Sequence, residues 1–314
     1  MEEPVSYSTC LKNAPRVPAN ASAVPKNRPT LPSENCPSPA IILRTPFDHP
    51  SSMPGPAKTV QRAGGWKPIL DPEGRYSTGV ADFDRLLGGG YQRGSMTLIS
   101  MDETVGREDL DLLLFPTFLN MLYQSRGIIA ILPSRDSPHD FRARLTRFVT
   151  RRRFDSRVRV IDYIGEDEGP PYVVNLHSPR EDATPGSTTP KERKAAIAKM
   201  VEAERAVQGN RKKTFLEVTA FEVFETLLGV EKALQMFFYG VKRTRHVGNL
   251  GIGLLGPGLA CAAGVRRLAD TEFALHRDEV GLIIRGVRPS FSSYVVTGDL
   301  EAGPPHVAFV PRPS

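Results

Sequence analysis

The stretch from residue 76 to residue 114 constrains the fold more than any other part of this sequence. Residues 77–87 begin with Ser-Thr-Gly and continue as a short amphipathic segment with helical spacing, which three glycines then end. Residues 95–100, SMTLIS, follow a turn at Gly94 and have the composition of a buried strand. A loop and a second helix come next. The stretch therefore predicts the strand–loop–helix unit of an α/β fold.

The loop in this unit has the length of a phosphate-binding loop but little of its chemistry. Such a loop reads G-x-x-x-x-G-K-[ST], because backbone N–H groups and a lysine surround the phosphates and a hydroxyl ligates Mg²⁺. Here Met101 takes the place of the first glycine, Arg107 that of the lysine and Glu108 that of the hydroxyl residue. Five carboxylates within ten residues would repel a triphosphate: Asp102, Glu103, Glu108, Asp109 and Asp111.

Two interpretations of this acidic loop remain open. Carboxylates in the first turn of a helix satisfy free N–H groups and complement the helix dipole. Glu108 and Asp109 are therefore predicted to supply the anion that a nucleotide would otherwise bring, and we prefer this self-capped turn. The alternative is weak binding of ATP and Mg²⁺ through Gly106, Arg107 and Glu108.

The string STGV-x-x-x-D-x-LLGGG-x-x-x-GS-x-x-LI, at residues 77–99, resembles the KaiC-like group of the RecA superfamily. This group includes the clock ATPase KaiC and the gas-vesicle regulator GvpD, and the resemblance continues more weakly to about residue 296. It implies a RecA-like P-loop α/β fold, with a mostly parallel central sheet and antiparallel strands toward the C-terminus. Inactive superfamily members, such as the ring subunits of the Elongator complex, show a comparable decay of the loop.

The same resemblance implies three further site positions, and each is altered here. Family ATPases activate water with paired acids just past the strand that corresponds to residues 128–132. This chain offers only Asp136 there, and we favour a helix-capping role for it. Glu217 occupies the second metal-site strand, and a structural role is favoured over Mg²⁺ binding. Where the family has a Lys and an Arg that reach the neighbouring subunit's phosphates, this chain has Ile283 and Arg285. Arg285 is thus left for a subunit interface or an ordinary salt bridge.

Periodicity predicts most of the remaining elements. The predicted helices are residues 110–123, 190–207 and 221–245, the last as one long helix. Apolar runs at 128–132 and 249–255 predict buried parallel strands. Residues 272–276, 280–285 and 293–297 alternate as the short strands of a meander.

Composition separates three segments along the chain. Half of the 28 prolines lie at or before Pro72, so residues 1–71 are predicted to be a Pro-rich disordered segment. Residues 72–298 are assigned to the RecA/KaiC-like domain and residues 299–314 to a flexible tail. Three scattered cysteines form no metal spacing or disulfide framework, which is typical of a cytoplasmic protein. No run of 18 apolar residues and no secretory signal are found in the sequence.

Residues 139–160 hold eight arginines against two aspartates, on a predicted helix and the strand after it. Such a run is usually a solvated face, but a net of six positive charges also attracts an acidic protein or a nucleic acid. Only Phe148 and Phe154 accompany the arginines, so stacking on a single strand is weakly indicated. Arg151, Arg152 and Arg153 are the predicted contact residues.

These observations predict a non-catalytic RecA/KaiC-like protein that acts in regulation or assembly through protein–protein contacts. The phosphate loop, the water-activating acid and the trans lysine are all changed, which argues against ATP hydrolysis. A protein partner, in a homo-oligomeric or hetero-oligomeric ring, is expected, and no membrane. Two alternatives remain: a nucleotide-binding ATPase with a divergent loop, and a nucleic-acid-associated accessory protein of the recombination type.

Overall fold

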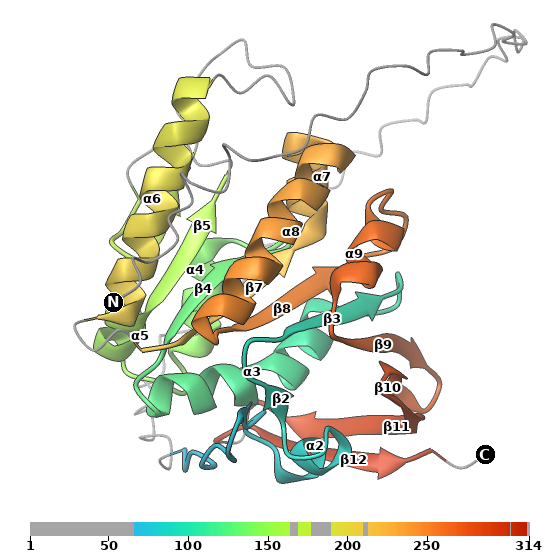
Figure 1. The fold of residues 1–314 in the computed structure, drawn as a ribbon. Helices are drawn as coiled ribbons and strands as arrows, with labels where there is room; N and C mark the ends of the chain where they lie inside the picture. The colour runs from blue at the N-terminus through green and yellow to red at the C-terminus, as the bar shows by residue number, and fades with distance from the viewer. Residues whose placement is uncertain (1–65, 164–168, 177–189, 210–212, 302, 313–314) are drawn as a thin grey trace, which may run out of the picture. The chain divides into compact units, whose positions relative to one another are not determined.

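A ten-stranded sheet organises the fold (Figure 1), in the order β12-β11-β10-β9-β3-β8-β7-β4-β5-β6. The computed structural model describes residues 66–163, 169–176, 190–209, 213–301 and 303–312. The parallel strands are β3 Met96–Met101, β4 Gly127–Ile131, β5 Val158–Asp162, β6 Val173–Asn175, β7 Phe215–Ala220, β8 Leu250–Leu255 and β9 Thr271–Asp278. The antiparallel strands are β10 Gly281–Arg288, β11 Ser290–Asp299 and β12 His306–Pro311. This mixed sheet confirms the predicted RecA-like fold class.

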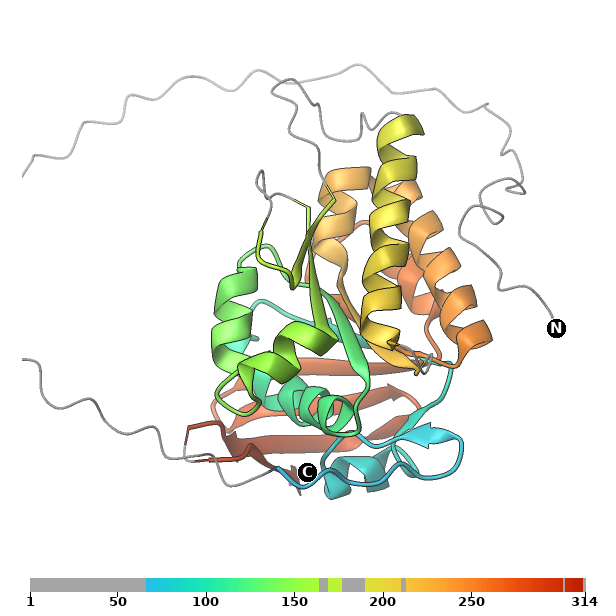
Figure 2. The ribbon, with the colours of Figure 1, turned by 90° about the vertical axis from the view of Figure 1, so that its left-hand side faces the viewer.

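Helices cover both faces of the parallel strands (Figure 2). One layer consists of α2 Ala81–Leu86, α3 Arg107–Tyr123, α4 Pro138–Leu145 and α5 Arg151–Arg157. The other consists of α6 Pro190–Gln208, α7 Phe221–Leu228, α8 Val230–Val247 and α9 Ala262–Leu268. Ile128 and Ala130 of β4 pack toward the first layer and Ile129 and Ile131 toward the second, because side chains alternate along a strand. None of the described helices is both long and apolar enough to cross a bilayer.

The glycine-rich stretch is held by one carboxylate. Asp84 is buried and accepts hydrogen bonds from the Ser77 hydroxyl and from the Thr78 N–H, at 2.7 Å for the latter. Gly79 has a φ of 83°, and a Cβ there would collide with the Pro116 carbonyl of α3. The turn thus brings α2 against α3. Asp84 and Gly79 have structural roles there, as a hydrogen-bond acceptor and as a point of close backbone approach.

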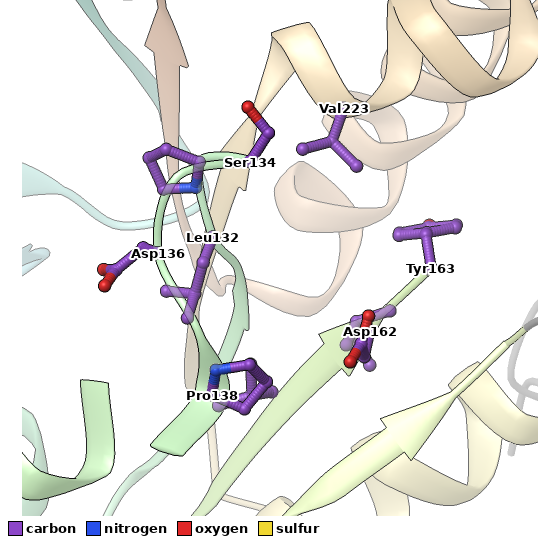
Figure 3. Close-up of a pocket in the computed structure, with 10 residues that line it drawn as sticks. Leu132, Ser134, Asp136, Pro138, Asp162, Tyr163 and Val223 are labelled. Atoms are coloured by element: carbon purple, nitrogen blue, oxygen red, sulfur yellow. The ribbon is translucent and has the colours of Figure 1, made fainter. Parts of the chain in front are cut away.

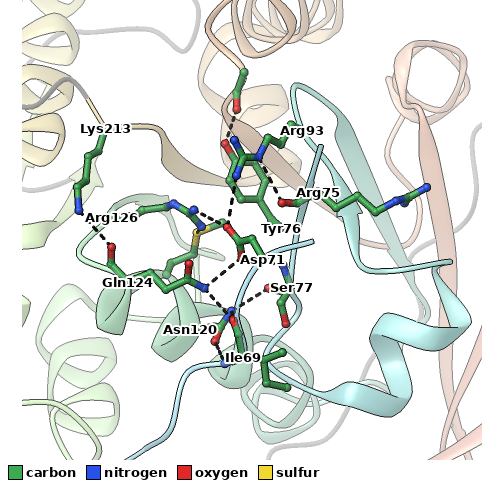
Figure 4. A network of polar contacts seen from close by, with 12 residues as sticks. Ile69, Asp71, Arg75, Tyr76, Ser77, Arg93, Asn120, Gln124, Arg126 and Lys213 are labelled. Carbon is green, nitrogen blue, oxygen red and sulfur yellow. Dashed lines mark hydrogen bonds and ion pairs between the residues drawn. The ribbon is translucent and has the colours of Figure 1, made fainter. Parts of the chain in front are cut away.

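A network of polar contacts ties the segment before this turn to the end of α3 (Figure 4). The Asn120 amide accepts the Ile69 N–H at 2.8 Å and donates to the Ile69 carbonyl at 3.1 Å. Asp71 pairs with Arg126, whose guanidinium lies 4.7 Å from the Tyr76 ring centroid. The packed structure therefore begins a few residues before the predicted boundary at 72. Residues 1–65 of the predicted disordered segment lie outside the described residues.

Three sequence predictions differ from the structure. Residues 221–245 form two helices, α7 and α8, because Gly229 between them has a φ of 76°, which interrupts helical backbone. The arginine run occupies two short helices, α4 and α5, before its strand. Residues 306–311, expected in a flexible tail, form β12, which pairs with β11. The Phe309 ring stacks on the Phe83 ring, with 4.6 Å between the ring centroids.

Candidate functional site

The acidic loop lies between β3 and α3, at the end of the sheet where the parallel strands β4, β7 and β8 also finish. Three of its N–H groups are engaged by side-chain or backbone acceptors of the loop and of the first turn of α3. The Thr104 N–H donates to the Asp102 carboxylate at 2.9 Å, and the Val105 N–H to the Asp102 carbonyl at 3.4 Å. The Gly106 N–H donates to the Asp109 carboxylate at 2.8 Å. The start of α3 is therefore capped from within the chain, by Asp109.

A second contact fixes Asp109 from across the sheet. Arg277 of β9 binds the buried Asp109 carboxylate with two nitrogens, one of them Nε at 3.3 Å. The backbone N–H of Arg277 also donates to the Thr104 hydroxyl at 2.7 Å. The Asp109 carboxylate raises the pKa of the Arg277 guanidinium. Sequence inspection did not find this pair, because its residues lie 168 positions apart and meet only through the pairing of β3 with β9.

The three residues predicted for nucleotide contact have different environments. Gly106 has an ordinary φ of −86°, and a Cβ there would meet nothing closer than 3.5 Å, so the backbone does not require a glycine. Arg107 is exposed, and its nearest ion-pair partner among the described residues is Asp136 at 3.5 Å. Glu108 is exposed, unlike its neighbour Asp109. Of Glu108 and Asp109, which were both predicted to cap α3, only Asp109 does so.

Asp136 belongs to an ion-pair network beside the loop, and its predicted capping role is wrong. The cap of α4 is the Ser137 hydroxyl, which accepts the Asp140 N–H at 3.0 Å. Arg144 of α4 bridges Asp136 and Asp111, at 2.6 Å to each carboxylate. Burial raises the pKa of Asp111 to about 6, against the opposing effect of Arg144. The charges next to the loop are thus neutralised within the protein.

Glu217 lies away from the loop. It sits in the middle of β7, half-buried, on the face that packs against the layer of α6 to α9, as its neighbour Phe215 does. The residue near the carboxyl end of β7 is Thr219, which has no carboxylate to offer a metal. No group of three or more His, Cys, Asp or Glu residues suited to a metal ion is found in the described part of the chain.

A hollow lies at the ends of β4 and β5, beside the ion-pair network of Asp136 and Arg144 (Figure 3). Its volume is about 350 Å³, which includes space open to solvent. Its lining is Leu132, Pro133, Ser134, Asp136, Pro138, Val160, Ile161, Asp162, Tyr163 and Val223. Glu222 of α7 accepts hydrogen bonds from the Ser134 N–H at 2.8 Å and from its hydroxyl at 3.0 Å. A second hollow, of about 420 Å³, lies next to Arg107 and is lined mainly by apolar side chains.

Most of the arginine run is used within the fold. Arg142 forms a bidentate pair with Asp155, at 2.9 and 3.0 Å. Arg157 donates to the Ser125 carbonyl at 3.0 Å, and Arg153 lies 4.3 Å from the Tyr123 ring centroid. The exposed members are Arg147, Arg151 and Arg152.

Arg285 lies on β10, far along the sheet from the arginine run. Its side chain is exposed and forms no ion pair with another residue in the described ranges. The structure therefore leaves Arg285 accessible to a partner, as a subunit interface would require.

The strand order and the two helix layers define a RecA-like α/β fold of the KaiC type. A KaiC-like protein from the hyperthermophilic archaeon Pyrococcus horikoshii OT3 superposes with a TM-score of 0.51 over 76% of this chain and 99% of its own, at 12% identity. The chain belongs to the family described as GvpD basic region 2, whose model matches residues 65–234 and so includes the arginine run.

Two curated proteins of Halobacterium salinarum are similar to this chain. Protein GvpD2 is 24% identical over 226 residues, which are 71% of this chain and 44% of that protein. Protein GvpD1 is 29% identical over 128 residues, which are 40% of this chain and 24% of that protein. The chain thus spans less than half the length of the curated relatives it matches.

Proposed function

We propose that this chain is a non-catalytic RecA/KaiC-like protein that acts in regulation or assembly through protein–protein contacts, in the cytoplasm. The observation that carries the proposal is the double engagement of Asp109, which accepts the Gly106 N–H and binds Arg277. In an active loop of this kind a phosphate would take the helix-end N–H groups and the cation. Here the Asp109 side chain takes the Gly106 N–H and the Arg277 cation, which supports a loop that needs no nucleotide.

The acidic surface of the loop also disfavours a triphosphate. Glu103 and Glu108 are exposed beside the buried Asp109, and the cation Arg107 is shared with Asp136. Added negative charge from a nucleotide would be repelled at this position. A divergent ATPase that binds ATP and Mg²⁺ weakly through Gly106, Arg107 and Glu108 remains the second candidate.

For the partner, three exposed arginines at two places on the fold support a protein contact. Arg285 on β10 is the candidate for a contact between subunits, within a homo-oligomeric or hetero-oligomeric ring. Arg151 and Arg152 at the start of α5 are the candidates for an acidic protein surface, because they are the exposed neighbours of arginines used inside the fold. A nucleic-acid partner is supported less, since few arginines of the run are exposed and Phe148 and Phe154 are buried.

A calorimetric titration with ATP and Mg²⁺ tests the proposal. We expect no saturable heat for the parent chain. The variant Met101→Gly/Arg107→Lys/Glu108→Thr/Asp109→Thr restores the phosphate-loop chemistry at these four positions and serves as the comparison.

Two outcomes would contradict the proposal. Parent binding with a dissociation constant near 10 μM, about −7 kcal/mol, would favour the ATPase candidate. Phosphate release from ATP by the parent, lost in the Arg107→Ala variant, would do the same.

A further inference from the structure

Three charged side chains from three different elements meet beneath α6, on the face of the sheet away from α3. Glu204 of α6 forms an ion pair with Arg243 of α8, and their side chains are only 10% and 19% exposed. Glu217 of β7 lies on the same face and interacts electrostatically with both. Two carboxylates therefore share one guanidinium, with Glu204 and Arg243 largely shielded from water and Glu217 half-buried.

This cluster carries a net negative charge when both glutamates are ionised. Burial disfavours the ionised form of a carboxylate, and a second carboxylate nearby disfavours it further. Burial raises the pKa of Glu204 to about 7, Arg243 opposes the rise, and Glu217 adds to it. Burial likewise raises the pKa of Glu217, against the effect of Arg243. One proton on the pair leaves a single carboxylate opposite a single arginine.

Three other cations on or near α6, among the residues whose side chains the structure describes, contribute little to this cluster. Arg205 on α6 itself is exposed and lowers the pKa of Glu204 only as a minor contribution. Arg157 of α5 donates to the Ser125 carbonyl, and Lys199 of α6 donates to the Asn175 carbonyl at 2.6 Å. Arg243 is therefore the main compensating charge that the described elements direct at the two glutamates.

The part of α6 that carries Glu204 packs closely against the sheet. Met200, Ala203 and Val207 are its buried apolar contacts. A Cβ at Gly127 of β4 would collide with Val207, so helix and strand approach each other without spare room. Glu204 lies among these residues, so the charge of the cluster is located where α6 meets the sheet.

We infer that docking of residues 200–208 of α6 on the sheet is coupled to the uptake of one proton shared by Glu204 and Glu217, so that the helix is held more firmly at acid pH than at pH 8. The docked state keeps the proton to a higher pH than the undocked state, where both glutamates are in water. The stabilisation is therefore complete below the pKa of free glutamate and is lost as the pH rises toward that of the docked pair. This makes α6 a pH-sensitive element, independent of any nucleotide.

Hydrogen exchange of the full chain, followed by mass spectrometry, tests the coupling. After correction for intrinsic exchange, the opening equilibrium of residues 200–208 should rise up to about tenfold per pH unit between pH 5 and pH 7, because one proton is released on opening. Glu204→Gln and Glu217→Gln should each reduce this slope, since either removes one of the two carboxylates that share the proton, while burial still acts on the other. The matched control Glu202→Gln changes an exposed glutamate of the same helix and should keep the slope.

Thermal melts of the same four proteins provide the second measurement. The melting temperature of the parent and of Glu202→Gln should fall between pH 5 and pH 7 more than that of the other two variants. Opening that is equal at pH 5 and pH 7 in the parent would overturn the inference. So would a slope that is as steep in both Glu204→Gln and Glu217→Gln as in the parent, in proteins that still melt cooperatively.

Discussion

Asp109 and Glu108 are adjacent acids with different roles. Asp109 is buried, accepts the Gly106 N–H and binds Arg277, whereas Glu108 is exposed. A carboxylate at the third position of a helix can reach back to the capping residue, whereas the one before it points away. Composition alone treats the two acids as equivalent, but only one of them is a helix cap.

We expect Asp109→Ala to lower the free energy of unfolding by about 2 kcal/mol, because a cap is lost and Arg277 loses its partner. Glu108→Ala should change it by less than about 0.5 kcal/mol, as is usual at exposed positions. Urea denaturation of the two variants at pH 7 measures both values. Equal losses would mean that Asp109 does not cap α3.

At the scale of elements, the turn between residues 77 and 90 positions α2 and α3. Asp84 provides the acceptor for the Ser77 hydroxyl and the Thr78 N–H, while Gly79 lets the backbone approach Pro116. These are structural roles, and they explain the serine, threonine, glycine and aspartate of this motif without any ligand.

Asp84→Ala should therefore cost about 3 kcal/mol, because it leaves buried donors without their charged acceptor. Asp82→Ala is the matched control on the same helix, since the Asp82 side chain is 43% exposed and pairs with Arg85 at the surface. Its loss should stay below about 1 kcal/mol. Chemical denaturation compares the two, and a similar cost for both would contradict the role given to Asp84.

Across the whole molecule, the end of the chain completes the core. Strand β12 adds to the antiparallel side of the sheet, and Phe309 stacks on Phe83 of α2. Phe309 is 7% exposed, whereas its neighbour Val310 is 49% exposed. Residues more than 200 positions apart thus share one apolar cluster.

Phe309→Ala should lower the free energy of unfolding by about 3 kcal/mol, through lost apolar burial and the cavity left behind. Val310→Ala, on the exposed side of the same strand, should change it by less than about 0.5 kcal/mol. Differential scanning calorimetry can measure both. If Phe309→Ala melts like the parent, β12 does not contribute to the core.

The sequence by itself was sufficient for the fold class and for most of the parallel strands. Residues 95–100, 128–132 and 249–255 are apolar runs whose local composition already requires burial on both faces of a sheet. The glycine spacing of residues 77–94 likewise predicted the turn before β3, because positive φ angles are a local property of the backbone.

Only the tertiary structure decided which charged residues meet. Arg277 reaches Asp109 because β9 lies beside β3, and Glu204 reaches Arg243 because α6 and α8 cover the same face of the sheet. For Glu217, at the family's second metal-site strand, a structural role was favoured, and its register in β7 places it on the face covered by α6 to α9. Strand order and register depend on contacts between residues far apart in the chain, which local periodicity does not encode.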